Sequence, residues 1–285
     1  VPDSRLIRAS GSATFDIDEF VAAQSGYIAR ATDEVEGEIL TAAQIVQRVS
    51  LEYSVDARLL LALLELKSAW LSQSDPPDDV REYPMGAPAS DAGFDRAGLY
   101  RQLAWAADNL NAGYYGWKEN SISFLEFTDG VRLIISPELN AGTVGVQYVL
   151  SRYTNYDTWS GQVGSSGVYA TYSRYFGDPF SSPIEPLIPA GLVQPELTFP
   201  FSSGEVWLYT GGHHGGWGTG SAWAAVDFAP PDERQDDSPA CYTSDYFAVA
   251  VADGVIARSE AGIVVLDLDG DGDESTGWTI LYLHI

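Results

Sequence analysis

The first part of the chain has apolar residues at helical spacing. Between residues 41 and 71 they recur every three or four positions, and Thr41-Ala-Ala-Gln44 is a capping-box pattern that starts a helix. Asp56 is suited to cap the next helix, which is apolar nearly all round and is therefore expected in a core. The pattern predicts helices near 15–20, 41–53, 57–71, 99–110, from 137 onward and 166–176, a hairpin at 122–135 and a loop at 72–93.

The period of the pattern changes after a proline-rich segment. Prolines cluster between Asp178 and Pro200, which is typical of a stiff, extended linker. Beyond it the apolar residues alternate, and we expect strands at 206–209, 224–228, 246–251, 254–257, 263–268 and 278–284. The sequence therefore predicts an α+β chain of two domains, with a helical domain at 1–177, a linker at 178–196 and an all-β antiparallel domain at 197–285.

Charge narrows the classes of partner. Acids outnumber bases 40 to 15, which gives a net charge of −25 and argues against a nucleic acid or an anionic membrane surface as the main partner. No apolar run reaches the roughly 20 residues of a membrane span. Cys241 is the single cysteine, and oligomeric state has no signature here. Because the chain starts at Val1 and stops at Ile285 directly after an apolar run, we expect both ends to be cut.

The histidines and one aspartate are the first candidates for a metal-binding or catalytic site. The three histidines, His213, His214 and His284, all lie in the predicted β domain, the first two within a loop of six glycines in ten residues. Asp227 follows His214 by thirteen residues and stands in an apolar strand, where a carboxylate is costly without a cation or hydrogen bonds. Imidazole nitrogen with carboxylate oxygen is a Zn²⁺ ligand set. The alternative is that both histidines are solvated and Asp227 caps a turn.

His284 stands near the end of the last predicted strand. Alternation along this strand puts Tyr282 and His284 on one face and the neighbouring leucines on the other. His284 is therefore either a structural residue or part of a polar face that lines a groove.

Five segments, in order, resemble the zinc endopeptidases of the lysostaphin/LytM type, and the His-to-Asp spacing is closest to their LasA-like, β-lytic branch. The resemblance implies that His214 and Asp227 bind Zn²⁺ and that His284 assists catalysis. The family's third ligand comes from a His-x-His pair that this chain lacks, so we expect it beyond Ile285 and expect the chain as given to be inactive. The five segments are 197–201, 207–218, 221–229, 252–256 and 278–285.

The function implied by this resemblance is hydrolysis of peptide bonds in bacterial cell-wall peptidoglycan, by a protein exported to the cell envelope or secreted. The alternative is a degenerate, non-catalytic protein that binds peptidoglycan or activates a partner. An intact His-x-His pair in the full-length gene would favour the enzyme, and its absence there would favour the alternative.

An acidic segment between the last two predicted strands is a second candidate metal site. Asp267, Asp269, Asp271 and Asp273 alternate with other residues, as at the start of a calcium loop. Glu274 comes too early to be the bidentate ligand of such a loop. The segment is therefore either a Ca²⁺ site or a solvated hairpin turn.

The helix predicted at 57–71 resembles the core helix of lysozyme-like lytic transglycosylases. In those enzymes a catalytic Glu precedes a Ser, whereas here Lys67 precedes Ser68 and Glu65 is rotated by roughly 200°. We therefore expect a lysozyme-like module that binds glycan without cutting it, and cleavage by Glu65 is the rival hypothesis. The aromatic residues suited either to stack on sugars or to fill the core are Trp105, Tyr114, Tyr115 and Trp117.

Overall fold

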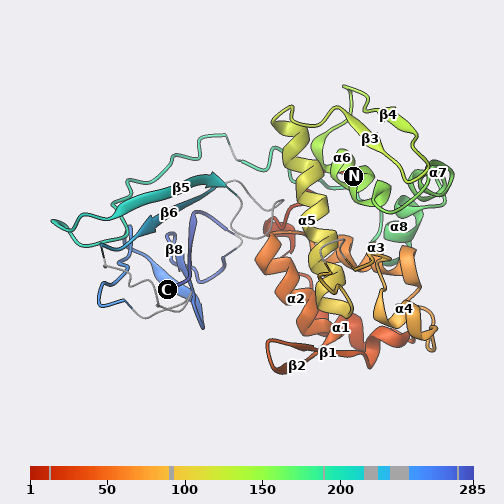
Figure 1. Cartoon of the computed structure of the whole chain (residues 1–285), viewed down its shortest axis with the longest axis horizontal. Helices are drawn as coiled ribbons and strands as arrows, with labels where there is room; N and C mark the ends of the chain where they lie inside the picture. The colour runs from red at the N-terminus through yellow and green to blue at the C-terminus, as the bar shows by residue number, and fades with distance from the viewer. Residues whose placement is uncertain (13, 90–92, 189, 215–223, 232–243, 275) are drawn as a thin grey trace. The chain divides into compact units, whose positions relative to one another are not determined.

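The computed structural model describes residues 1–12, 14–89, 93–188, 190–214, 224–231, 244–274 and 276–285. These residues form two compact units. Unit 1 comprises the described residues of Val1–Pro189, and unit 2 comprises those of 190–285. Unit 1 is mainly helical and unit 2 is built from small antiparallel sheets, so the chain is of the α+β class (Figure 1).

Unit 1 contains α-helices, short 3₁₀ helices and two β-hairpins. The helices are α1 (Ile17–Ala22), α2 (Ala42–Tyr53), α3 (Ala57–Ser68), α4 (Asp78–Glu82), α5 (Leu99–Lys118), α6 (Ala141–Ser151), α7 (Tyr156–Val163) and α8 (Val168–Phe176). The hairpins pair β1 (Thr32–Val35) with β2 (Glu38–Thr41) and β3 (Phe124–Glu126) with β4 (Arg132–Ile134).

The start of α2 and the start of α3 follow the capping signals of the sequence. The Thr41 hydroxyl accepts from the Gln44 amide, and the Gln44 side chain accepts from the Thr41 amide, so the capping box is confirmed. Asp56 accepts from the Arg58 amide at the start of α3. Helix α3 ends at Ser68 rather than near 71, because Ala69 adopts a left-handed conformation with φ 52°.

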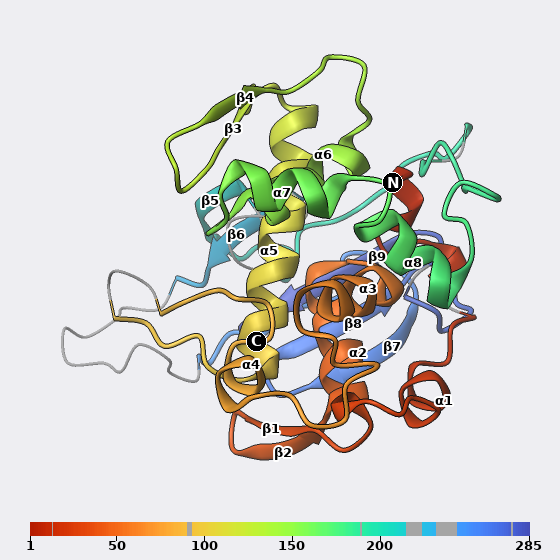
Figure 2. The same ribbon diagram turned by 90° about the vertical axis from the view of Figure 1, so that its right-hand side faces the viewer.

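The core of unit 1 surrounds α3. Every residue from Leu59 to Leu64 is fully buried, as expected for a helix that is apolar all round. Helix α3 packs on α8, while the long helix α5 packs on α2 and α6. Figure 2 shows α5 running along unit 1, with α6 and α7 near one end and β1–β2 near the other.

Four local predictions in unit 1 were wrong or incomplete. The hairpin β1–β2 and helix α7 were missed, and α4 lies in the stretch predicted as loop. The fourth predicted helix begins at Ala141, not at Pro137. Its early amide, that of Gly142, donates to Asp3 Oδ1 at 2.8 Å. A cap supplied from so far along the chain leaves no local sequence signal.

Unit 2 consists of two separate sheets. Strand β5 (Leu208–His214) pairs with β6 (Ala225–Ala229), and β7 (Val255–Glu260), β8 (Ile263–Asp267) and β9 (Thr279–Leu283) form a three-stranded sheet. The strand predicted at 246–251 is wrong. Val249 donates to the Pro200 carbonyl and Thr198 donates to the Val251 carbonyl, but these two contacts do not continue into a strand ladder.

Part of the segment predicted as a linker contacts unit 1. Arg5 donates to the Ser182 carbonyl at 3.2 Å, the Ile184 amide donates to Ser4 Oγ at 3.1 Å, and Leu187 packs against the core. These contacts attach residues 182–187 to unit 1, whereas the predicted limits of the domains and linker stay predictions. In the described part of the chain, no helix is long and apolar enough to cross a membrane.

Candidate functional site

Strands β5 and β6 form a two-stranded ribbon that carries Asp227. Asp227 pairs with Gly211, and a Cβ atom at residue 211 would lie 2.6 Å from Asp227 Oδ2. Glycine at 211 allows the carboxylate to lie over the neighbouring strand, and a larger residue there would displace it. The ribbon therefore holds a carboxylate oxygen close to the backbone of β5.

His214 is the last residue of β5, and its backbone pairs with Ala225, two residues before Asp227. Residues 211–214 were predicted as part of a loop, but they belong to this strand, which contains two register irregularities. The side chains of His213 and His214 lie outside the described residues, as do the rest of the glycine-rich segment and Cys241. The predicted approach of His214 to Asp227 therefore stays a prediction.

The environment of Asp227 differs from the one expected. The sequence predicted a carboxylate buried in an apolar strand, but Asp227 is exposed because β5–β6 has only two strands. Alternation along β6 separates it from Phe228, whose ring contacts Phe199, Phe201 and Tyr209. One face of the ribbon is thus aromatic, and Asp227 belongs to the other face.

His284 follows β9 rather than standing within it. The strand ends at Leu283, and His284 has φ 61° and is exposed. The left-handed backbone interrupts the alternation, so the prediction that Tyr282 and His284 share a strand face was wrong. The Tyr282 hydroxyl accepts from the Val251 amide at 2.8 Å, which makes this tyrosine a structural residue. The catalytic role of His284 stays a prediction.

The aspartate-rich loop after β8 brings three carboxylates together. Oxygen atoms of Asp267, Asp269 and Asp271 lie within 4.8 Å of one another. Asp267 is buried, and its Oδ2 accepts from the Gly272 amide at 2.8 Å, which lowers its pKa. The neighbouring Asp267 carboxylate raises the pKa of Asp269. Clustered carboxylate oxygens are the ligands that Ca²⁺ prefers, and the predicted Ca²⁺ site stays a prediction.

Two further acids of this segment have other roles. Asp273 was predicted as a ligand but is not a member of the converging group, and its amide donates to Asp271 Oδ1 at 2.7 Å. Glu274 binds Arg258 of β7 through two contacts of 3.2 Å. Glu274 therefore ties the loop to the sheet and does not face the three aspartates as a further ligand.

In unit 1, Glu65 is a structural residue. It is buried and accepts hydrogen bonds from the Leu71 amide, the Ser72 amide and hydroxyl, and the Tyr175 hydroxyl of α8. Of the two surroundings that the sequence left open for Glu65, a neighbouring helix or solvent, the structure has the helix, α8. Lys67 is half-buried, and burial lowers its pKa. The oxygens of the Glu65 carboxylate are thus committed to four donors of the protein, which leaves little capacity to bind a substrate.

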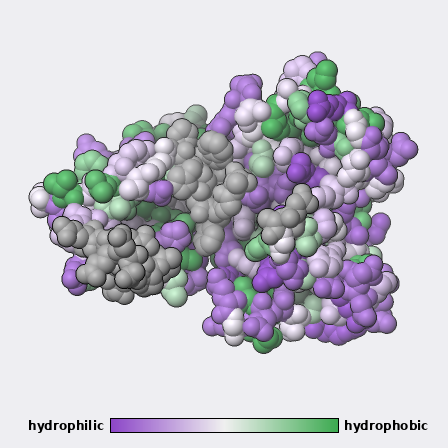
Figure 3. All heavy atoms as spheres, in the orientation of Figure 1, coloured by the Kyte–Doolittle hydropathy of each residue, from purple (hydrophilic) through white to green (hydrophobic). Residues whose placement is uncertain are grey.

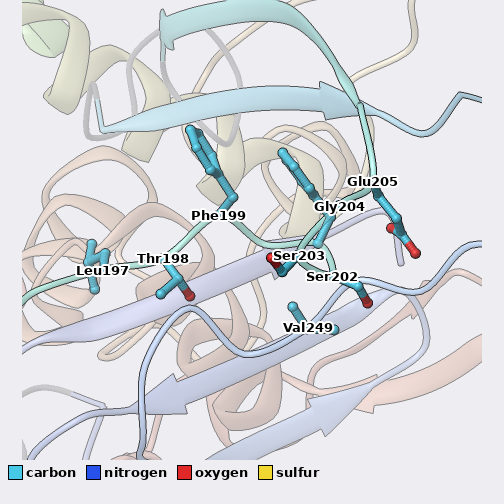
Figure 4. A pocket seen from close by; sticks show the side chains of 9 residues that line it. Leu197, Thr198, Phe199, Ser202, Ser203, Gly204, Glu205 and Val249 are labelled. Carbon is cyan, nitrogen blue, oxygen red and sulfur yellow. The ribbon is translucent and has the colours of Figure 1, made fainter.

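A shallow cavity of about 710 Å³ lies in unit 2, and sequence reasoning missed it. It is lined by the segment 197–205 and by Val249 (Figure 4). Phe199 stacks on Phe201, which stacks on Trp207, and the Phe199-Pro-Phe201 spacing was the available signal. Figure 4 shows the Glu205 carboxylate pointing away from Phe199, so ring and carboxylate do not converge on one ligand.

Comparison with known proteins places the chain in a family. Residues 1–189 match the family model described as LasA, N-terminal domain. No curated protein matches the chain. No solved structure matches it either. The match covers well over half of the sequence, and the chain therefore belongs to the LasA N-terminal domain family.

Proposed function

We propose that this chain is part of a secreted zinc metalloendopeptidase that hydrolyses peptide bonds of bacterial cell-wall peptidoglycan. In this proposal His214 and Asp227 are zinc ligands, and His284 exchanges protons with the substrate or with the attacking water. The observation that carries the proposal is the geometry of Asp227, whose carboxylate lies over Gly211 of the strand that ends in His214. Membership of the LasA N-terminal domain family supports it independently.

The described residues fit a metal in two respects. The Asp227 residue is exposed, and its Oδ2 lies over Gly211 of the strand that ends in His214. The residue types are also those that bind zinc in proteins. When bound, zinc supplies a Lewis acid that polarises a peptide carbonyl and acidifies water.

His284 carries an imidazole, which is the group that the proposed proton exchange requires. An imidazole can accept a proton from water and return it to a leaving amine. Its exposed position after β9 leaves the ring accessible to a peptide substrate. Replacing it should lower the rate of hydrolysis and leave zinc affinity unchanged.

Zinc affinity tests the proposal. Titration of the full chain with Zn²⁺ should give a dissociation constant that rises at least about tenfold in His214→Ala and in Asp227→Asn. His213→Ala is the matched control, because it removes the adjacent imidazole and should leave affinity unchanged. Equal loss in His213→Ala, or unchanged affinity in Asp227→Asn, would contradict the ligand assignment. Binding of the chain to cell wall without any affinity for zinc would instead favour a non-catalytic binding protein.

A further inference from the structure

Trp105 differs from the other described tryptophans. In each of the others the indole N–H donates a hydrogen bond within the protein, at 2.9–3.3 Å. Trp105 makes no such bond in the described part of the chain, although it is half-buried against the core of unit 1. An indole with one apolar side packed and its N–H unused is suited to a ligand contact. The five donors and their acceptors are Trp70 to Val80, Trp117 to Leu139, Trp159 to Gln147, Trp207 to Glu205 and Trp278 to Val193.

Tyr153 extends the surface of this indole. The two rings have centroids 5.8 Å apart and planes inclined by 31°. Tyr153 is 47% exposed and adopts a left-handed conformation with φ 53°, directly after the C-terminal cap of α6. Glycine or asparagine is the usual residue at such a position, and a bulky side chain there is unfavourable. The fold therefore keeps a tyrosine beside Trp105 at a conformational cost.

The ring pair itself restricts the class of ligand. It offers two neighbouring ring surfaces and an indole donor. A saccharide matches this combination, because it has apolar C–H faces flanked by hydroxyl and amide oxygens that accept hydrogen bonds.

We propose that Trp105 and Tyr153 form a carbohydrate-binding surface, on which one sugar of an oligosaccharide stacks while the indole N–H donates to one of its oxygens. That the saccharide is a cell-wall glycan rests on the proposed function. That the ring pair binds a saccharide at all rests on the ring geometry alone. The surface differs from the set expected from sequence. Tyr114 is buried in the core, and the Trp117 N–H is already bonded to the Leu139 carbonyl.

Calorimetric titration of the full 285-residue chain with an N-acetylglucosamine tetramer tests this proposal. Trp105→Phe keeps an aromatic ring but removes the donor, and the dissociation constant should rise about fivefold, the effect of one neutral hydrogen bond. Tyr153→Asn suits the left-handed backbone and removes the exposed ring, so the constant should rise about tenfold. Tyr169→Ala is the matched control. Tyr169 is a comparably exposed tyrosine of unit 1 that contacts Phe180, and affinity should not change.

Three outcomes would overturn the proposal: no binding of the tetramer at millimolar concentration, wild-type affinity in both Trp105→Phe and Tyr153→Asn, or equal weakening in Tyr169→Ala. Zinc titration of the same samples separates this proposal from the peptidase. Trp105→Phe should bind zinc as the wild type does. A wild-type chain that binds the tetramer but no zinc would contradict the peptidase proposal and leave the carbohydrate surface supported.

Discussion

The two units bury apolar side chains to very different extents. Unit 1 has a continuous core drawn from its helices, including six consecutive fully buried residues at 59–64. Among the described residues of unit 2, the buried hydrophobic side chains are Val251, Val265 and Leu266. Exposed hydrophobic residues gather there instead, and Figure 3 shows them as green spheres on the visible surface of that unit.

The difference in burial between the units applies to their carboxylates as well. In unit 1 the carboxylate of Glu65 is 7% exposed and committed to four hydrogen bonds. In unit 2 the carboxylate of Asp227 is exposed on a thin ribbon. A buried, fully bonded carboxylate stabilises a fold, whereas an exposed one beside glycine is accessible to a ligand. The carboxylate of unit 1 thus serves stability, whereas the exposed one of unit 2 is the proposed ligand.

Truncating one leucine in each unit gives the largest expected contrast. Leu61 is fully buried in α3, so Leu61→Ala should lower the free energy of unfolding of unit 1 by about 3 kcal/mol. Leu281 is 41% exposed on β9, and Leu281→Ala should cost less than about 1 kcal/mol. Amide hydrogen exchange of peptides from each unit measures both effects. Equal losses in the two variants would show that the described burial does not govern stability.

The two carboxylates provide the second contrast. In Glu65→Gln an NH₂ donor replaces one of the carboxylate oxygens that accept four hydrogen bonds, so unit 1 should lose about 2 kcal/mol of stability while zinc affinity stays unchanged. Asp227→Asn should lower zinc affinity and leave the stability of the chain unchanged. Denaturant unfolding and zinc titration, run on both variants, distinguish the two roles. Release of sugar fragments that Glu65→Gln abolishes would show that Glu65 is catalytic.

The sequence was most informative where local signals act alone. The capping box at Thr41, the cap at Asp56 and the apolar spacing of α5 each correspond to an observed helix boundary or face. Helix α6 was misplaced because Asp3, distant in sequence, caps it. The hairpin β1–β2 was missed because its strands are mostly exposed, which leaves no alternating apolar pattern.

The candidate site was predictable in its residue types but not in its surroundings. Asp227 was expected to be buried because its neighbours are apolar, yet a sheet of two strands buries neither face fully. Alternation was extended through His284, although a left-handed residue ended the strand pattern there. The unused indole of Trp105 has no sequence signal, because hydrogen-bond satisfaction depends on tertiary contacts.

Charge distinguishes the units as well, and a cation tests that difference. Residues 190–285 contain 15 acids and 2 bases, whereas residues 1–189 contain 25 acids and 13 bases. If the loop at Asp267 binds Ca²⁺, calcium at ten times its dissociation constant should stabilise unit 2 by about 1.4 kcal/mol and leave unit 1 unchanged. Asp269→Asn should abolish the effect, whereas Asp253→Asn, an exposed charge-matched control, should preserve it. Hydrogen exchange with and without calcium is the measurement, and stabilisation that survives in Asp269→Asn would contradict a site at this loop.

The smallest expected effect concerns the half-buried lysine of unit 1. Burial lowers the pKa of Lys67 below its ordinary value of about 10.4, so the folded chain releases this proton at a lower pH than the unfolded chain. Between the two pKa values the unfolded chain binds more protons, and stability therefore rises with pH; below both values the cost of burying the charge is fully present. Lys67→Met removes that cost and should stabilise unit 1 at neutral pH by about 0.5 kcal/mol or less. The advantage of Lys67→Met over wild type should shrink as pH rises toward about 10.4.

Lys118→Met is the matched control at the only other lysine. Lys118 contacts Tyr114 and is exposed, so this substitution should not stabilise the chain. Urea unfolding of the three proteins at neutral and alkaline pH measures the difference, and a Lys67→Met advantage that grows with pH would contradict the assigned direction of the pKa shift.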